Sequence, residues 1–150
     1  MAPALLACRG PAIEPMEAAE SMPPTENLQR VPQVALGRLI HQGLFTTGLF
    51  LEVSETPTRR LYLADQIGVD ITDISDWRDE ALLLNLANFG PDEQRILTQA
   101  GIVGLQDAVD CEAGDFKDRV AEAAYTLGVE APTELTIQGW HDQAQVLAEG

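Results

Sequence analysis

Apolar residues recur at spacings of three and four along the chain from about Pro32 onward, with polar residues between them. This spacing keeps apolar side chains on one face of an α-helix, whereas a half-buried strand would place them at every second residue. No window of the sequence alternates in that way. The pattern therefore predicts an all-α protein.

Two helices, one near the end of each half of the chain, carry the same apolar residues in the same order. Both have Ile, Trp, Ala and Leu at spacings of three, four and three, with a constant offset of 63 residues. The positions are Ile74, Trp77, Ala81 and Leu84 in the first helix and Ile137, Trp140, Ala144 and Leu147 in the second. Since this spacing forms one stripe, we expect these residues to anchor the core. We expect both tryptophans to be buried rather than to form a ligand platform.

Further matches upstream indicate an internal repeat. Ala64, Gly68 and Val69 match Ala124, Gly128 and Val129, and Leu39 and Gly43 match Leu97 and Gly101. The offset grows near residues 112–115 and 130–136, where Gly, Pro and Thr are typical of loops that tolerate insertion. We therefore expect two diverged copies of a unit of four short helices, residues 31–90 and 91–150, packed as one compact domain.

Residue types that favour helix caps predict where several helices begin and end. Glycine ends helices because it adopts a left-handed conformation, while Thr, Ser, Asp and Asn cap the first turn. The expected C-terminal residues are Gly68, Gly101 and Gly128. The expected N-caps are Thr56 with Pro57 behind it, Thr72 or Asp73 for the helix of Trp77, and Thr136 for the helix of Trp140.

Residues 1–30 differ from the rest in composition. They hold five of the nine prolines together with Ala and Glu, and no apolar period precedes Val34. Prolines interrupt helices, and so few large apolar side chains cannot offset the entropy lost on ordering. This segment is predicted to be a disordered leader.

The junction between the two copies, residues 86–102, contains the most specific local signal. It resembles a helix-hairpin-helix element, in which a glycine-containing turn joins two helices and offers backbone amides that can bind a phosphate. The turn here is Asn88, Phe89 and Gly90, with Arg95 one turn into the next helix. Asn tolerates a left-handed conformation better than most residues, so the turn can form without a first glycine.

The repeated layout as a whole, from about Val34 to Leu147, resembles a bacterial family of tandem helix-hairpin-helix-like units described as a domain of unknown function. The resemblance is carried by the glycines that end the first helices, by the hairpin turn and by the two helices with Trp followed four residues later by Ala. It implies a compact helical fold. It implies no particular activity, substrate or catalytic residue.

The hairpin departs from the nucleic-acid-binding members of the wider helix-hairpin-helix superfamily. Those proteins place Lys or Arg beside the turn, whereas Pro91, Asp92 and Glu93 follow Gly90 here. Proline has no N–H to donate, and the two carboxylates suit a helix N-terminus because they complement its dipole. Arg95 alone cannot reverse this field, so the hairpin is not expected to bind nucleic acid.

The distribution of charge along the chain also argues against a nucleic-acid partner. The formal net charge is −15, and residues 92–150 contain twelve acidic against three basic side chains. Such a surface repels nucleic acids and membrane headgroups. We expect a protein partner that offers a basic or apolar patch, although the same acidity could serve only to keep the chain soluble and monomeric. Cys8 and Cys111 follow no pairing pattern, and a reducing cytoplasm is the expected location.

Candidate enzymatic residues do not form a recognisable set. His41 and His141 have no serine or cysteine in a nucleophile setting, and the acidic stretch 110–118 lacks the ligand spacing of a calcium loop and is interpreted as a solvated linker. We expect no catalytic residue, no metal and no cofactor. The sequence thus favours a non-enzymatic adaptor or scaffold, with a degenerate helix-hairpin-helix protein that still contacts nucleic acid as the alternative.

Overall fold

The computed structural model describes residues 23–149, and within that range the chain forms eight α-helices and no strand. The predicted all-α class is confirmed. The elements are a 3-10 turn η1 (Thr25–Asn27), followed by α2 (Gln33–His41), α3 (Thr47–Val53), α4 (Pro57–Ile67), α5 (Ile71–Leu84), α6 (Pro91–Gln99), α7 (Leu105–Asp110), α8 (Ala113–Leu127) and α9 (Glu134–Glu149). None of the helices in the described range combines the length and the apolar character needed to cross a bilayer.

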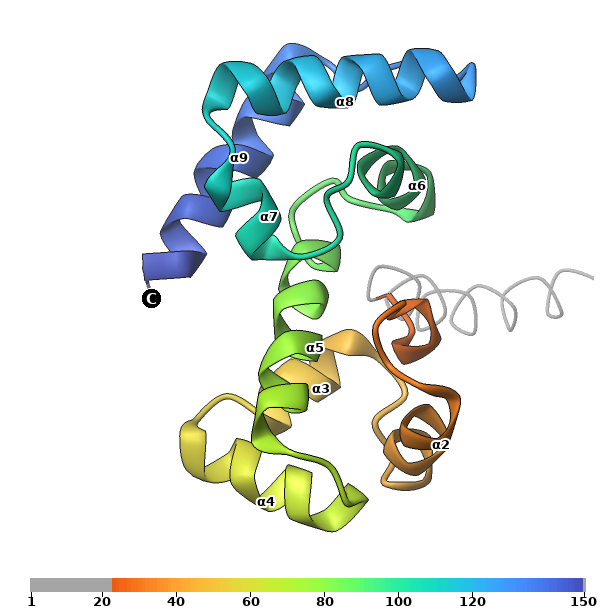
Figure 1. The fold of residues 1–150 in the computed structure, drawn as a ribbon, viewed down its shortest axis with the longest axis vertical. Coiled ribbons are helices and arrows are strands. Elements are labelled where there is room, and N and C mark those ends of the chain that lie inside the picture. The colour runs from red at the N-terminus through yellow and green to blue at the C-terminus, as the bar shows by residue number, and fades with distance from the viewer. Residues whose placement is uncertain (1–22, 150) are drawn as a thin grey trace, which may run out of the picture.

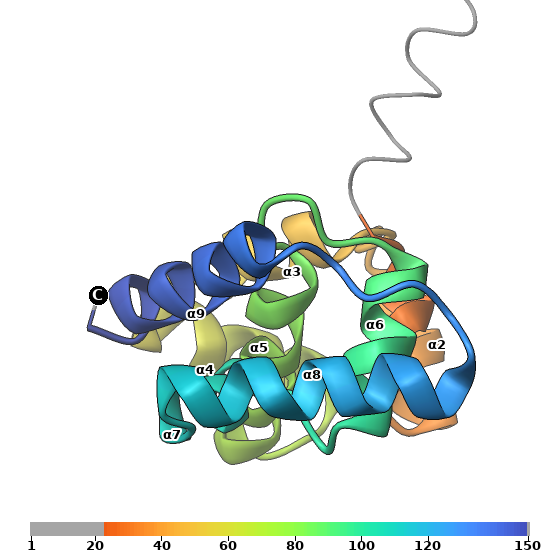
Figure 2. The same ribbon diagram turned by 90° about the horizontal axis from the view of Figure 1, so that it is seen from above.

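The helices fall into two groups, each around its own core. Figure 1 shows α2 to α5 at one end of the molecule and α6 to α9 at the other, with α5 running along the long axis between them. Trp77 belongs to the first core and Trp140 to the second, and the ring of Phe89 packs against both. Seen from above in Figure 2, α8 and α9 extend across the end of α5. We call the two groups the first half and the second half.

Residues that match between the halves have closely similar structures. Gly43 and Gly101 end their helices at φ 87° and 83°, and Gly68 and Gly128 end theirs at φ 71° each. A side chain at these four positions would be strained, which is why glycine occurs at all of them. The equivalent helix ends therefore share one backbone geometry.

Seven of the eight expected core anchors are buried, and Leu147 is the exception. Ile74, Trp77, Ala81, Leu84, Ile137, Trp140 and Ala144 are all at most 4% exposed, whereas Leu147 is 38% exposed. Its counterpart Leu84 lies in the first core, next to the hairpin residues Phe89, Gly90 and Pro91. No described element comes after α9 to cover its last turn in the same way.

Two predicted N-caps lie a few residues too late. Helix α5 begins after Asp70, whose amide donates to Asp73 Oδ2 at 3.3 Å, so Asp73 belongs to the first turn and Thr72 is not the cap. At the start of α9, the Thr136 amide donates to the Thr133 hydroxyl at 3.2 Å, and the cap is Thr133 rather than Thr136. The cap at Thr56 and the proline behind it are confirmed.

The acidic stretch 110–118 is not a linker, because most of it belongs to α8. Phe116 and Val120, four residues apart, are both fully buried against the second core. This pair supplies the apolar face that makes a helix stable despite the surrounding carboxylates. Helix α8 accordingly begins at Ala113.

The predicted leader boundary is also wrong, because residues 23–30 are part of the fold. We call residues 23–31 the strap. Thr25 is fully buried, donating its hydroxyl to the Leu44 carbonyl at 2.7 Å, and Leu28 and Val31 lie in the first core. The remainder of the expected leader, residues 1–22, lies outside the described residues, as does residue 150.

The strap also reaches the second half. The Gln94 side chain on α6 donates to the Asn27 carbonyl at 3.0 Å, and the Gln29 side chain donates to the Thr98 hydroxyl at 3.0 Å. Arg30 forms an ion pair with Asp107 at 3.6 Å. The strap therefore joins the two halves in addition to completing the first core.

Deleting the strap is expected to destabilise the protein. A chain that begins at Val31 loses the burial of Leu28 and two hydrogen-bond donors to a buried carboxylate on α5, and its free energy of unfolding should fall by at least about 3 kcal/mol. Urea denaturation measures the loss. A chain that begins at Pro23 is the control that separates the strap from the residues before it. Equal stability of the two truncated chains would contradict the assignment of the strap to the core.

Replacing either buried tryptophan is expected to remove a large part of the stability. Trp77→Ala and Trp140→Ala should each lower the free energy of unfolding by about 3 to 5 kcal/mol. Trp140 should be the costlier of the two, because its indole N–H also donates to the Ala87 carbonyl at 2.9 Å. The variant Trp140→Phe keeps an aromatic ring and loses that donor and part of the ring volume, so it should be milder than Trp140→Ala. A Trp140→Ala chain as stable as the parent would show that this side chain does not hold the second core.

Candidate functional site at the hairpin between the halves

The hairpin, residues 86–91, turns the chain from α5 into α6 and adopts the conformation that its sequence suggests. Asn88 is left-handed at φ 61°, the only non-glycine residue of the described range with positive φ. Its amide side chain makes this conformation less costly than for other residue types. The turn thus contains a left-handed residue that is not glycine.

The amide of Gly90, at the start of α6, is already occupied. It donates to Glu93 Oε1 at 2.9 Å, and the next residue, Pro91, has no N–H at all. A phosphate approaching this helix N-terminus would have to displace a carboxylate of the same chain. Asp92 is exposed beside it and adds repulsion. The hairpin is therefore capped from within.

The other side of the hairpin is fastened to α9. The ring of Phe89 meets that of Trp140 edge to face with centroids 5.4 Å apart. The Ala87 carbonyl accepts from Trp140 Nε1, and the Ala87 amide donates to Gln143 Oε1 at 3.1 Å. The hairpin is consequently both the covalent connection between the two halves and a point where they pack together, through its contacts with α9.

Arg95, the fourth residue expected at this site, lines a hollow. The hollow, of about 400 Å³, lies between the strap and α6. Its lining consists of Asn27, Gln29, Gln94, Arg95, Thr98, Gln99 and Leu127. The structure thus brings Asn88, Phe89 and Gly90 together and places the exposed Arg95 on a neighbouring surface.

The basic side chains of the described region mostly serve the chain's own structure. Of eight such residues, seven make an ion pair or donate to a carbonyl, carboxylate or sulfur of this chain. Four of these, Arg38, Arg59, Arg60 and Arg78, donate to backbone carbonyls at the ends of α3 and α4 and in the turn between them. Arg95 is the one without such a contact within residues 23–149. These contacts leave few cations free to neutralise a phosphate backbone.

A buried carboxylate, Glu80, lies at the junction and was not singled out in the sequence. It is 1% exposed and accepts hydrogen bonds from the amides of Gln29 at 2.6 Å and Arg30 at 2.9 Å. Burial raises the pKa of its carboxyl, the two amides and the Arg30 charge lower it, and the neighbouring Asp79 raises it. The signal in the sequence was an acid three residues after Trp77, on the apolar stripe of α5.

Asp79, the residue before Glu80, contacts both the second half and the strap. Its Oδ1 accepts from the Gln106 amide in the first turn of α7 at 2.8 Å, and its Oδ2 pairs with Arg30 at 3.0 Å. Gly104 makes this approach possible, because a Cβ there would lie only 2.0 Å from Asp79 Oδ2. Neighbouring carboxylates of α5 thus hold the strap and α7.

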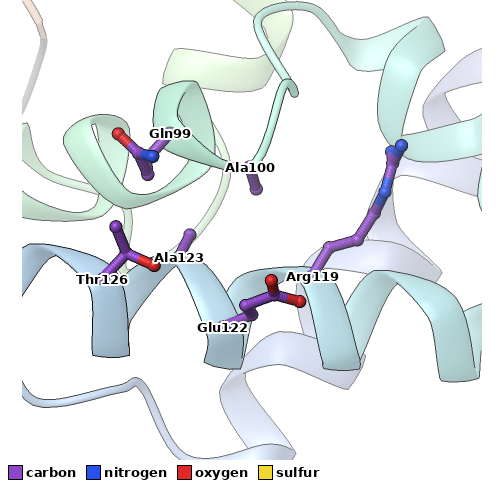
Figure 3. A pocket seen from close by; sticks show the side chains of 6 residues that line it. All are labelled: Gln99, Ala100, Arg119, Glu122, Ala123 and Thr126. Atoms are coloured by element: carbon purple, nitrogen blue, oxygen red, sulfur yellow. The ribbon is translucent and has the colours of Figure 1, made fainter.

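A further hollow, of about 230 Å³, separates α6 from α8 in the second half. Figure 3 shows its six lining side chains, with Arg119 extending away from Gln99. Arg119 donates to Cys111 Sγ at 3.3 Å, and the Cys111 carbonyl accepts from Nε2 of the buried His141 at 2.8 Å. These polar groups connect α7, α8 and α9. Among the described residues no group of three or more His, Cys, Asp and Glu side chains is placed to hold a metal ion.

The fold and the hairpin define a class of protein, namely an all-α domain with two groups of four helices joined by an internally capped turn. The chain belongs to the family described as Domain of unknown function (DUF4332), whose profile matches residues 30–147. Comparisons with curated proteins and with solved structures gave no match.

The stability of the protein is expected to depend on the ionisation of Glu80. Since its folded pKa lies above the unfolded value of 4.5, the native state binds more protons than the unfolded chain between the two pKa values. The contribution of the neutral carboxyl is complete below about pH 4.5 and is lost as the pH rises through the folded pKa. The free energy of unfolding should therefore fall, relative to that of Glu80→Gln, as the pH increases through this window.

Denaturant titrations of both proteins between acidic and neutral pH measure this difference. Glu122→Gln removes one carboxylate from the surface of α8 and controls for the change in net charge. Parallel pH profiles for the parent and Glu80→Gln would show that the buried carboxylate has no influence on stability.

Proposed function

We propose that this protein is a non-enzymatic adaptor or scaffold, which binds another protein through its helical surface. We further propose that its two halves are diverged copies of one helix-hairpin-helix-like unit. The observation that carries the proposal is the internally capped hairpin, in which Glu93 occupies the amide that a phosphate would use. The net charge of −15 and the engaged basic side chains support it.

The exposed faces of α4 and α8 offer candidate surfaces for binding a partner protein. Leu61 and Tyr62 on α4 are 61% and 68% exposed, and beside them lies a hollow of about 440 Å³. The equivalent face of α8 carries Asp118, Glu122 and Tyr125, the last 87% exposed. The inward faces of the two helices match, whereas one outward face is apolar and the other acidic. Such divergence fits surfaces for different parts of a partner.

Nucleic-acid binding is the second candidate, and one observation favours it. Asn88 is left-handed at φ 61°, which is the conformation that a first glycine would adopt in a helix-hairpin-helix turn, and this supports a turn of that kind. Against it stand the Glu93 carboxylate on the Gly90 amide, the missing donor at Pro91 and the negative field of the whole chain.

The isolated protein is therefore expected not to bind nucleic acid at physiological ionic strength. Non-specific binding has dissociation constants of about 10⁻⁴ to 10⁻⁶ M even when several cations contact phosphates, and this hairpin offers few. Fluorescence anisotropy with labelled single- and double-stranded oligonucleotides measures the affinity. Micromolar binding that is lost on Gly90→Glu would overturn the adaptor proposal and favour the nucleic-acid alternative.

A matched pair of charge variants tests whether the hairpin backbone can bind nucleic acid once its local negative charge is removed. Asp92→Lys with Glu93→Lys frees the Gly90 amide and reverses the local charge, so this variant should gain binding. Asp115→Lys with Asp118→Lys makes the same change in net charge on α8, away from the hairpin. Equal gains in the two variants would show that overall charge, and not the hairpin, accounts for the binding.

A further inference from the structure

We propose that the groove holding the strap is a peptide-binding groove, occupied here by the chain's own residues 23–31. Its ligand class is a segment of a partner protein that forms the same 3-10 turn as Thr25–Asn27, carries apolar residues and an arginine, and exchanges with the strap. This inference rests on the proposed adaptor function and names the groove and the kind of partner segment.

The groove recognises the strap largely through its main chain. The Thr25 amide donates to the Phe45 carbonyl at 3.0 Å, and the Pro23 carbonyl accepts from the Thr47 amide at 2.8 Å. The Asn27 carbonyl accepts from Gln94. Main-chain contacts of this kind contribute affinity for a peptide without depending on the peptide's sequence.

Glu80 completes the main-chain recognition. Its two carboxylate oxygens accept separately from the amides of Gln29 and Arg30, at a point where the carboxylate is buried. A buried charge without donors is strongly unfavourable. An empty groove is therefore penalised, and exchange of one segment for another is favoured over simple release of the strap.

Side chains of the strap define the pattern that a partner segment must satisfy. Thr25 fits a fully buried position, and Leu28 and Val31 fill the first core. Arg30 meets Asp79 and Asp107, one from each half. A threonine, a leucine three residues later, and then an arginine followed by valine form this pattern. The acidic pair selects a basic residue, in agreement with the charge of the protein.

The extent of the family match separates the groove from its occupant. The matched region begins at residue 30, so the carboxylates, carbonyls and apolar walls of the groove belong to it, whereas most of the strap lies before it. The fit is also incomplete. A cavity of about 60 Å³ remains between Pro23, Pro24 and Asn27 of the strap and the hairpin residues Phe89, Gly90 and Pro91. This space can accept a larger side chain from another segment.

A peptide of the strap sequence, residues 23–32, added in trans to the full chain tests the proposal. The parent chain should bind the labelled peptide weakly, because its own strap competes at high effective concentration. Leu28→Asp in the chain weakens the internal strap and leaves the groove intact. This variant should bind the parental peptide at least about tenfold more tightly than the parent chain does. The same peptide should raise the melting temperature of the variant.

Two controls distinguish binding in the groove from non-specific binding of the peptide. A peptide that itself carries the Leu28→Asp change should bind neither chain. The chain variant Leu61→Asp makes the same chemical change on the exposed face of α4 and should bind the parental peptide no better than the parent chain does. Leu28→Ala, a milder change, replaces Leu28→Asp if the latter fails to fold.

Absence of binding of the parental peptide to a folded Leu28→Ala chain would overturn the proposal, as would equal binding of the altered peptide. Such a result would leave the adaptor proposal intact, since the latter is tested by the oligonucleotide titrations. Nucleic-acid binding at the hairpin, in turn, would overturn the adaptor proposal whatever the peptide does. The two failures are therefore distinguishable.

Discussion

The arrangement of the two halves depends on neighbouring carboxylates in the middle of α5. Glu80 points inward and needs the strap amides, because a buried carboxylate without donors would be far less stable than one in water. Asp79 points to the second half, where it accepts from the first turn of α7 and pairs with Arg30. Since Arg30 belongs to the strap, both carboxylates act on one segment, and the position of α7 relative to α5 is linked to the presence of that segment.

The sequence was sufficient for the number of helices and for the helix ends at glycine, and insufficient for several helix starts and for the contacts between halves. Spacings of three and four follow from helix geometry alone, and glycine is needed wherever φ is positive, so the helix count and the ends at Gly68, Gly101 and Gly128 could be predicted. The strap could not, because its prolines predict an irregular chain and its order comes from distant contacts, among them those with Leu44 and with Glu80, about fifty positions away. The expectation for Leu147 is wrong for a related reason, since burial in the last turn of a helix depends on neighbouring elements rather than on the stripe.

The candidate site shows the same division between local and distant information. Asparagine in a left-handed turn and acids in the first turn of a helix are local preferences, and both could be predicted from residues 88–93. The contacts of Phe89 and Ala87 with Trp140 and Gln143 cross about fifty residues, and no local pattern predicts them. These contacts hold one side of the turn against α9, and on the other side the Gly90 amide already donates to Glu93.

The two halves differ in how the helices α3 and α7 are capped. In the first half Thr46 caps α3 with its own hydroxyl, which accepts from the Leu49 amide at 3.2 Å. The equivalent position before α7 is Gly104, which has no side chain to offer, and Asp79 of the first half caps the helix in its place. Helix α3 is thus capped by a residue of its own half, whereas α7 is capped by a residue of the other half. The start of α7 therefore depends on the first half, but the start of α3 does not depend on the second. A segment displacing the strap would therefore act first on Arg30 and Asp79, and through them on α7, while α3 and its cap would be unaffected.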